Sequence, residues 1–200
     1  MKKIYLILGL CLFLGACGGG GGGGGSNAST STTVGGSKLD VKAGGKDSTL
    51  NVKSGGASFS GMNYSIPGKP ATKASIHTIH IANYDLDGAN PAKALATPDQ
   101  MRVDIRIIGE EGTWDTSPFK VGTYNPKAEQ FNKVSNVTIV TFADGKQVET
   151  RFDNSSGNKK IDGDVKIASV TADTVSGEVN LTEGDKSVKG PFTLKLPAKK

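Results

Sequence analysis

The chain has 200 residues, of which 28 are glycine and two are cysteine, and its net charge is +5. This length suggests one domain or at most two, and two cysteines are too few for a scaffold held by disulfides. Aromatic residues (6%) and charged residues (22%) occur at ordinary frequencies, which excludes a fully disordered or collagen-like chain. The basic residues are spread along the chain, which argues against a nucleic-acid-binding protein.

The first 17 residues have the features of an export signal. Lys2 and Lys3 precede an uncharged run over residues 4–14. This run is too short to span a bilayer, which takes about 20 residues, but it suits the hydrophobic region of a signal peptide. The segment Leu14-Gly15-Ala16-Cys17 follows, and it resembles the lipobox of bacterial lipoproteins. The alternative is an ordinary secretory signal with a chance cysteine near its cleavage site.

The resemblance implies that Cys17 becomes the N-terminal residue and carries the lipid. It implies cleavage before Cys17, a diacylglycerol thioether on its sulfur and acylation of its amino group. Several acyl chains hold a protein stably on a membrane. In lipoprotein families an Asp directly after the cysteine often marks retention in the inner membrane. Because Gly18 stands there, the resemblance implies a lipid anchor in the outer membrane of a Gram-negative cell, facing the periplasm or the cell surface.

Processing at this site would leave the mature protein without a free thiol. Cys11 would leave with the signal and Cys17 would be consumed by the lipid. We therefore expect no disulfide, no cysteine-bound metal and no cysteine nucleophile. Loss of Lys2 and Lys3 would lower the net charge to +3.

Residues 17–37 are predicted to form a flexible tether. Residues 18–25 are all glycine, and no large apolar residue occurs over 26–33. Such a linker behaves as a random coil with an average span of about 25 Å. The glycine run is similar in composition to surface-displayed lipoproteins of Neisseria-like bacteria, although the aromatic-Gly signatures of their eight-stranded barrels are absent. Both surface display and a periplasm-facing position stay open.

The predicted single domain, residues 38–200, begins with a short repeat. Residues 37–45 recur as residues 48–56 with six of nine positions identical. In each copy the apolar residues alternate with polar ones, which is typical of a strand with one buried face. The repeat predicts a hairpin of amphipathic strands, or an extension of the tether with marginal order over 38–57.

Further strands are predicted along the rest of the chain. Residues 101–107 alternate apolar and charged side chains, which predicts a strand with one face on the core and the other in water. Asp144-Gly145 suits a type I′ turn of a hairpin. Pro191 predicts that the last strand lies at a sheet edge or carries a bulge beside Gly190. The other expected strands cover residues 58–66, 74–84, 138–142, 147–152, 165–170, 175–181 and 187–196.

Helix has little support in this sequence. The best candidate covers residues 90–96, with Asn90 as N-cap, Pro91 at the first helical position and Pro98 beyond its end. About ten short strands separated by turn residues predict an all-β fold, either an antiparallel β-sandwich or a β-barrel.

Few residues are candidates for chemistry. His77 and His80 lie in a predicted strand, where a spacing of three places them on opposite faces and prevents joint metal binding. We expect one on the solvent face and one half-buried. Asp85 and Asp87 are weak calcium candidates, because the following residues depart from a calcium loop and a polar turn explains them. Trp114 is either a binding anchor or a cap on the end of the core.

The sequence therefore predicts no catalytic residue, no cofactor, no bound metal and no enzyme activity. The leading hypothesis is a lipid-anchored envelope protein whose β-domain binds a protein or small molecule, or has a structural role. A carrier would instead need an apolar cavity of a few hundred Å³. An adhesin would need an exposed apolar patch, for example around Trp114. An enzyme would need His77 or His80 in a cleft beside a carboxylate.

Overall fold

Two antiparallel β-sheets pack face to face in the computed structural model, which describes residues 36–65, 67–152 and 160–196. The predicted signal, Cys17 and most of the tether lie outside these ranges. The six-stranded sheet has the order β2-β1-β11-β10-β9-β6, and the five-stranded sheet has the order β3-β4-β5-β7-β8. The strands are β1 (Lys38–Ala43), β2 (Lys46–Asn51), β3 (Ser54–Tyr64), β4 (Thr72–Ala82), β5 (Met101–Glu111), β6 (Gly122–Tyr124), β7 (Lys133–Ala143), β8 (Lys146–Arg151), β9 (Asp162–Val170), β10 (Thr174–Glu183) and β11 (Lys186–Lys195).

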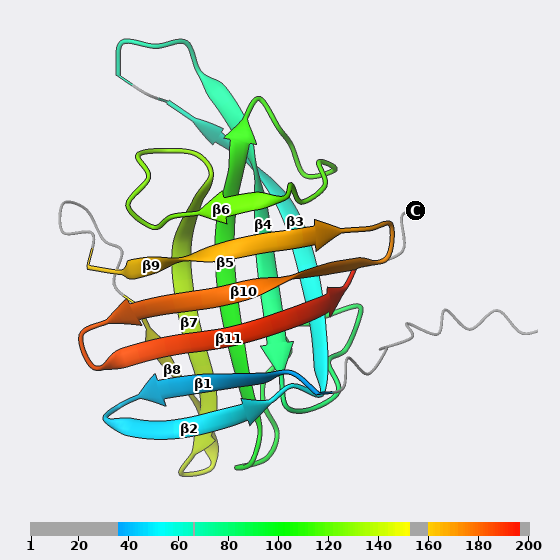
Figure 1. Ribbon diagram of the computed structural model, residues 1–200, viewed down its shortest axis with the longest axis vertical. Coiled ribbons are helices and arrows are strands. Elements are labelled where there is room, and N and C mark those ends of the chain that lie inside the picture. The colour runs from blue at the N-terminus through cyan, green and yellow to red at the C-terminus, as the bar shows by residue number, and fades with distance from the viewer. Residues whose placement is uncertain (1–35, 66, 153–159, 197–200) are drawn as a thin grey trace, which may run out of the picture.

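The strands of the two sheets cross steeply, with β9, β10 and β11 running over β4, β5 and β7 (Figure 1). Alternation along each strand directs one set of apolar side chains into the space between the sheets. Ile79, Ile105 and Ile139 enter this core from the five-stranded sheet, and Val179 and Phe192 enter it from the six-stranded sheet; all are buried. The predicted all-β fold is confirmed, and it is a sandwich.

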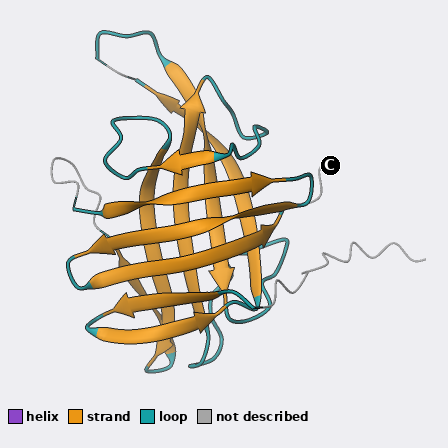
Figure 2. Cartoon of the chain, in the orientation of Figure 1, coloured by secondary structure: helices purple, strands orange, loops and turns teal. Residues whose placement is uncertain are grey.

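The described residues contain strands, turns and loops but no helix (Figure 2). In this part of the chain nothing helical has the length and hydropathy of a membrane span.

The repeat near the N-terminus forms the hairpin of β1 and β2. Leu39 pairs with Leu50 across the two strands, and both side chains are fully buried in the core. Gly44 and Gly45 form the turn with φ values of +58° and +75°, a conformation that favours glycine. The predicted amphipathic hairpin is therefore confirmed, and it extends the six-stranded sheet at one edge.

Two local predictions about turns and edges have different outcomes. Asp144 and Gly145 both have positive φ, +51° and +75°, as the predicted type I′ turn between β7 and β8 requires. Pro191 predicted that its strand lies at the edge of a sheet. This prediction is wrong, because the strand that contains Pro191, β11, lies between β1 and β10. The ladder between β1 and β11 ends at Lys189, so Pro191 lies just beyond the residues paired with β1. Its pairing with β10 is regular through Gly190, without the predicted bulge.

The predicted helix over residues 90–96 is also wrong. These residues belong to the loop that joins β4 to β5. Tertiary contacts use the backbone groups that a helix would need: the Lys93 carbonyl accepts a hydrogen bond from Arg102 at 2.6 Å, and the Leu95 amide donates one to Gln147 at 3.2 Å. The loop over residues 83–100 thereby folds back over part of the five-stranded sheet, on the face turned away from the core.

Candidate functional site

The polar side chains of interest lie on the outer face of the five-stranded sheet, opposite to the core. The strand registers align them in two rows that cross the sheet, with neighbouring residues directly opposite each other on adjacent strands. One row is Gly56, His80, Asp104 and Thr138, and the next is Ser58, Thr78, Arg106 and Asn136.

The loop over residues 83–100 covers one part of this face and creates a hydrogen-bonded group of five residues, which we call the covered cluster: Ser58, Tyr84, His80, Arg102 and Asp104. His80 Nδ1 lies 2.7 Å from Asp104 Oδ1, and His80 Nε2 lies 3.1 Å from Ser58 Oγ. The Nε atom of Arg102 donates to both carboxylate oxygens of Asp104, at 2.8 and 3.0 Å. Its Nη1 atom donates to the Tyr84 hydroxyl at 3.1 Å.

The covered cluster corrects one expectation for residues 101–107. The charged face of that strand was expected in water, but Arg102 is only 3% exposed because the β4–β5 loop lies over it. Burial by itself lowers the pKa of Arg102, and the hydrogen bonds and charge of Asp104 outweigh this effect, so its pKa is raised. The guanidinium therefore stays charged and its ion pair is satisfied within the fold.

Ser58, His80 and Asp104 have the atom order of a Ser-His-Asp relay, because one histidine nitrogen faces a hydroxyl and the other faces a carboxylate. Two features favour a structural role. Asp104 is already bound by Arg102, which neutralises its charge. Ser58 is exposed in the middle of β3, whereas a nucleophilic serine on a sharp strand-to-helix turn has amides gathered around its hydroxyl to stabilise the oxyanion.

The two histidines lie on opposite faces of β4, as predicted, but neither is in solvent: His77 is 2% exposed and His80 is 3% exposed. His77 lies against the rings of Phe59 and Phe119, with centroid distances of 5.1 and 4.4 Å. Its Nε2 atom donates to the Ser117 carbonyl at 3.0 Å, and its buried Nδ1 atom has no hydrogen-bond partner within the described ranges. Burial lowers the pKa of His77 to about 4, so the ring is neutral near pH 7.

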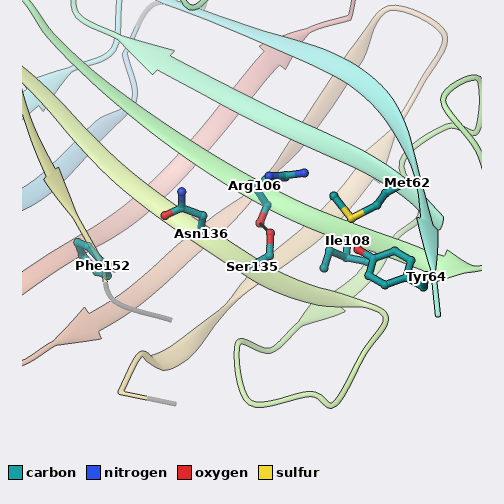
Figure 3. Close-up of a pocket in the computed structure, with 7 residues that line it drawn as sticks. All are labelled: Met62, Tyr64, Arg106, Ile108, Ser135, Asn136 and Phe152. Carbon is teal, nitrogen blue, oxygen red and sulfur yellow. Dashed lines mark hydrogen bonds between the residues drawn. The ribbon is translucent and has the colours of Figure 1, made fainter. Parts of the chain in front are cut away.

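Beside the covered cluster, the same outer face has an open depression with a volume of about 450 Å³ (Figure 3). Four of its lining residues are polar: Tyr64, Arg106, Ser135 and Asn136. The other three are apolar: Met62, Ile108 and Phe152. In this view Met62 and Arg106 extend toward each other, and Tyr64 lies beside Ile108.

Two polar groups in this open depression are unsatisfied. Arg106 is half-buried, and its guanidinium makes no hydrogen bond or ion pair with any other described residue. The Tyr64 hydroxyl oxygen is buried and likewise has no hydrogen-bond partner in the described part of the chain. Burial raises the pKa of Tyr64, and the positive charge of Arg106 opposes this only in part, so the hydroxyl stays protonated. The Arg106 guanidinium is therefore available to a ligand, whereas protein atoms cover the Tyr64 hydroxyl oxygen.

A second depression lies on the six-stranded sheet over the β1–β2 hairpin. Its charged side chains include Lys42 and Asp47, which form an ion pair with each other at 3.8 Å. Unlike Arg106, this lysine has a protein partner for its charge.

Trp114 lies in the loop after β5, with its ring on Gly61 of β3. A Cβ atom at Gly61 would come within 2.6 Å of the indole ring, so only glycine fits beneath it. Lys73 is on β4, and its Nζ atom lies 5.6 Å from the centroid of the Trp114 ring, which is within the range of a cation–π contact. Trp114 is half-buried and does not line the open depression.

The carboxylates of Asp85 and Asp87, the weak calcium candidates, have different partners. Asp85 pairs with Lys53 at 2.9 Å, whereas the Asp87 carboxylate accepts a hydrogen bond from the Ala89 amide at 2.9 Å and so stabilises its own turn. Among the described residues there is no group of three or more His, Cys, Asp or Glu side chains that could hold a metal. Cys17 lies outside the described residues.

Sequence reasoning missed the residues that matter most on the outer face. The available signal was the spacing of Arg102, Asp104 and Arg106, which places three charges on one face of a strand. Neither the loop that covers Arg102 nor the neighbouring Tyr64 could be recognised from that spacing, since both come from other parts of the chain.

No protein-family model matches the chain, and neither does any of the curated proteins or solved structures compared with it. A function can therefore be inferred only from the chemistry of the residues described above.

Proposed function

We propose that this protein is a lipid-anchored bacterial envelope lipoprotein whose tethered β-sandwich binds a ligand without catalysing a reaction. The proposed lipid anchor is supported by the order of segments at the N-terminus. These are Lys2 and Lys3, an uncharged run, the lipobox-like residues ending at Cys17, and the glycine run. The first strand begins at Lys38. About 20 residues of tether would therefore separate the lipid from the sandwich.

Binding is proposed at the outer surface, because the space between the sheets is taken by core side chains. A carrier needs an apolar cavity, but the open depression lies outside the core and has a mixed lining. Its Arg106 guanidinium is the group that a ligand could satisfy. A hydrolase is the second candidate, because Ser58, His80 and Asp104 have the relay geometry, although the ion pair of Asp104 with Arg102 disfavours it.

The anchor is tested by metabolic labelling with an alkyne analogue of palmitate. We expect the wild type and Cys11→Ala to carry the label and to fractionate with membranes, since Cys11 lies in the segment that is removed. Cys17→Ala should lose the label and leave the membrane fraction. Persistent labelling of Cys17→Ala, or absence of label from the wild type, would contradict the proposal.

The side of the membrane is tested by protease treatment of intact cells that express the wild type. Cleavage without permeabilisation would indicate display at the cell surface. Cleavage only after permeabilisation would indicate a domain that faces the periplasm.

A further inference from the structure

We propose that the open depression binds a small organic monoanion, with its carboxylate on Arg106 and its apolar part against Met62 and Ile108. This inference rests on the proposed binding function and assigns the ligand class of that site. Arg106 lies on the outer face of the five-stranded sheet, and its guanidinium has no partner among the described residues.

The positive charge of Arg106 is not compensated within its own row or the next one. Asp104 lies two residues earlier on the same face of β5, but its carboxylate is bound by Arg102 and His80. The other described members of the Arg106 row, Ser58, Thr78 and Asn136, are uncharged. A guanidinium binds a carboxylate through two parallel hydrogen bonds, so a ligand carboxylate would supply the partner that Arg106 lacks among the described residues.

Tyr64 forms part of the wall of the depression. Its ring packs edge-on against Phe131, with centroids 5.6 Å apart, and this contact holds the phenol in place. The raised pKa keeps the hydroxyl protonated, so Tyr64 adds no negative charge that would compete with a ligand for Arg106.

The remaining lining residues limit the size and charge of the ligand. One arginine balances one negative charge, which favours a monoanion over a phosphate dianion. Met62 is 36% exposed and Ile108 lines the depression beside Tyr64, so an aromatic or aliphatic group beside the carboxylate would cover apolar surface. Ser135 already donates its hydroxyl to the Arg106 carbonyl at 3.2 Å, so it supports the strand.

The methionine methyl groups provide a direct test. Once Met1 has left with the signal, Met62 and Met101 are the methionines of the mature chain. Met62 lines the depression, whereas Met101 packs against the core between the sheets. The lipidated protein in nanodiscs, with ¹³C-labelled methionine methyl groups, is titrated with naphthalene-2-carboxylate. We expect a saturable shift of the Met62 resonance and no shift of Met101.

Two analogues and two variants define the chemistry. The neutral 2-naphthalenemethanol should bind at least about tenfold more weakly than the carboxylate, and 2-naphthyl phosphate should also bind more weakly. Arg106→Gln should weaken carboxylate binding about tenfold. Lys166→Gln removes the same charge from the exposed face of the six-stranded sheet and should have no effect. An unchanged Met101 resonance reports that each variant is folded.

Equal binding of the alcohol and the carboxylate would overturn the inference, as would full affinity in Arg106→Gln or saturation without a response at Met62. Tighter binding of the phosphate ester would overturn the assignment of a carboxylate. These outcomes are separate from the palmitate label on Cys17, so the ligand class can fail while the lipid anchor stands.

Discussion

Arg102 and Arg106 lie four residues apart on the same face of β5, yet their surroundings are opposite. Arg102 is buried under the β4–β5 loop, where Asp104, Tyr84 and the Lys93 carbonyl accept its hydrogen bonds. Arg106 lies where the loop does not reach, and its charge has no partner among the described residues. A satisfied buried charge contributes to the fold, whereas an unsatisfied one at a depression is available to a ligand.

The largest effect is expected from removing the satisfied arginine. Arg102→Met leaves the half-buried Asp104 with one partner fewer beneath the loop, and we expect the free energy of unfolding to fall by about 3 kcal/mol. Arg106→Met is the matched control and should change it by about 0.5 kcal/mol or less. Urea denaturation of both variants measures the difference. Similar losses in the two variants would mean that Arg106 has a structural partner after all.

The same contrast separates the two histidines, because both ring nitrogens of His80 have partners and only one of His77 does. The pKa of His77 is about 4 in the folded protein and about 6.5 in the unfolded chain, so the unfolded state binds more protons between these values. The stabilisation is complete above pH 6.5 and is lost as the pH falls toward 4, by about 3 kcal/mol.

His77→Phe removes this titration while keeping an aromatic ring between Phe59 and Phe119. The difference in unfolding free energy between the wild type and this variant should therefore shrink or reverse from pH 7 to pH 4. Measuring urea denaturation at several pH values gives this difference directly. Parallel pH profiles would show that the pKa of His77 is the same in the folded and unfolded states and would contradict this prediction.

The smallest effect is expected at Ser58, which is exposed and contributes one hydrogen bond to the covered cluster. Ser58→Ala should lower the free energy of unfolding by about 1 kcal/mol. Ser60→Ala, another exposed serine on the same face of β3, is the control. Because we propose that the protein does not catalyse a reaction, a fluorophosphonate should leave Ser58 unmodified, as read by mass spectrometry. Covalent labelling that disappears in Ser58→Ala would instead support the hydrolase.

The strands themselves could be predicted because their signals are local. The alternation over residues 101–107 matches β5, the Asp144-Gly145 turn matches the β7–β8 hairpin, and the N-terminal repeat matches β1 and β2. The helix predicted over residues 90–96 failed for a non-local reason. Arg102 and Gln147, which lie elsewhere in the chain, take the backbone groups that a helix would use.

By itself, the sequence determined the periodicity of the strands, the positions of their turns and the placement of His77 and His80 on opposite faces of β4. These depend on the two-residue repeat of side chains along an extended strand, which can be recognised within a few consecutive residues of the sequence. Only the tertiary structure decided between a sandwich and a barrel, and only it decided which polar groups are satisfied. Arg102 and Arg106 are equivalent in the strand pattern, and they differ because a loop from another part of the chain covers one and leaves the other at the depression.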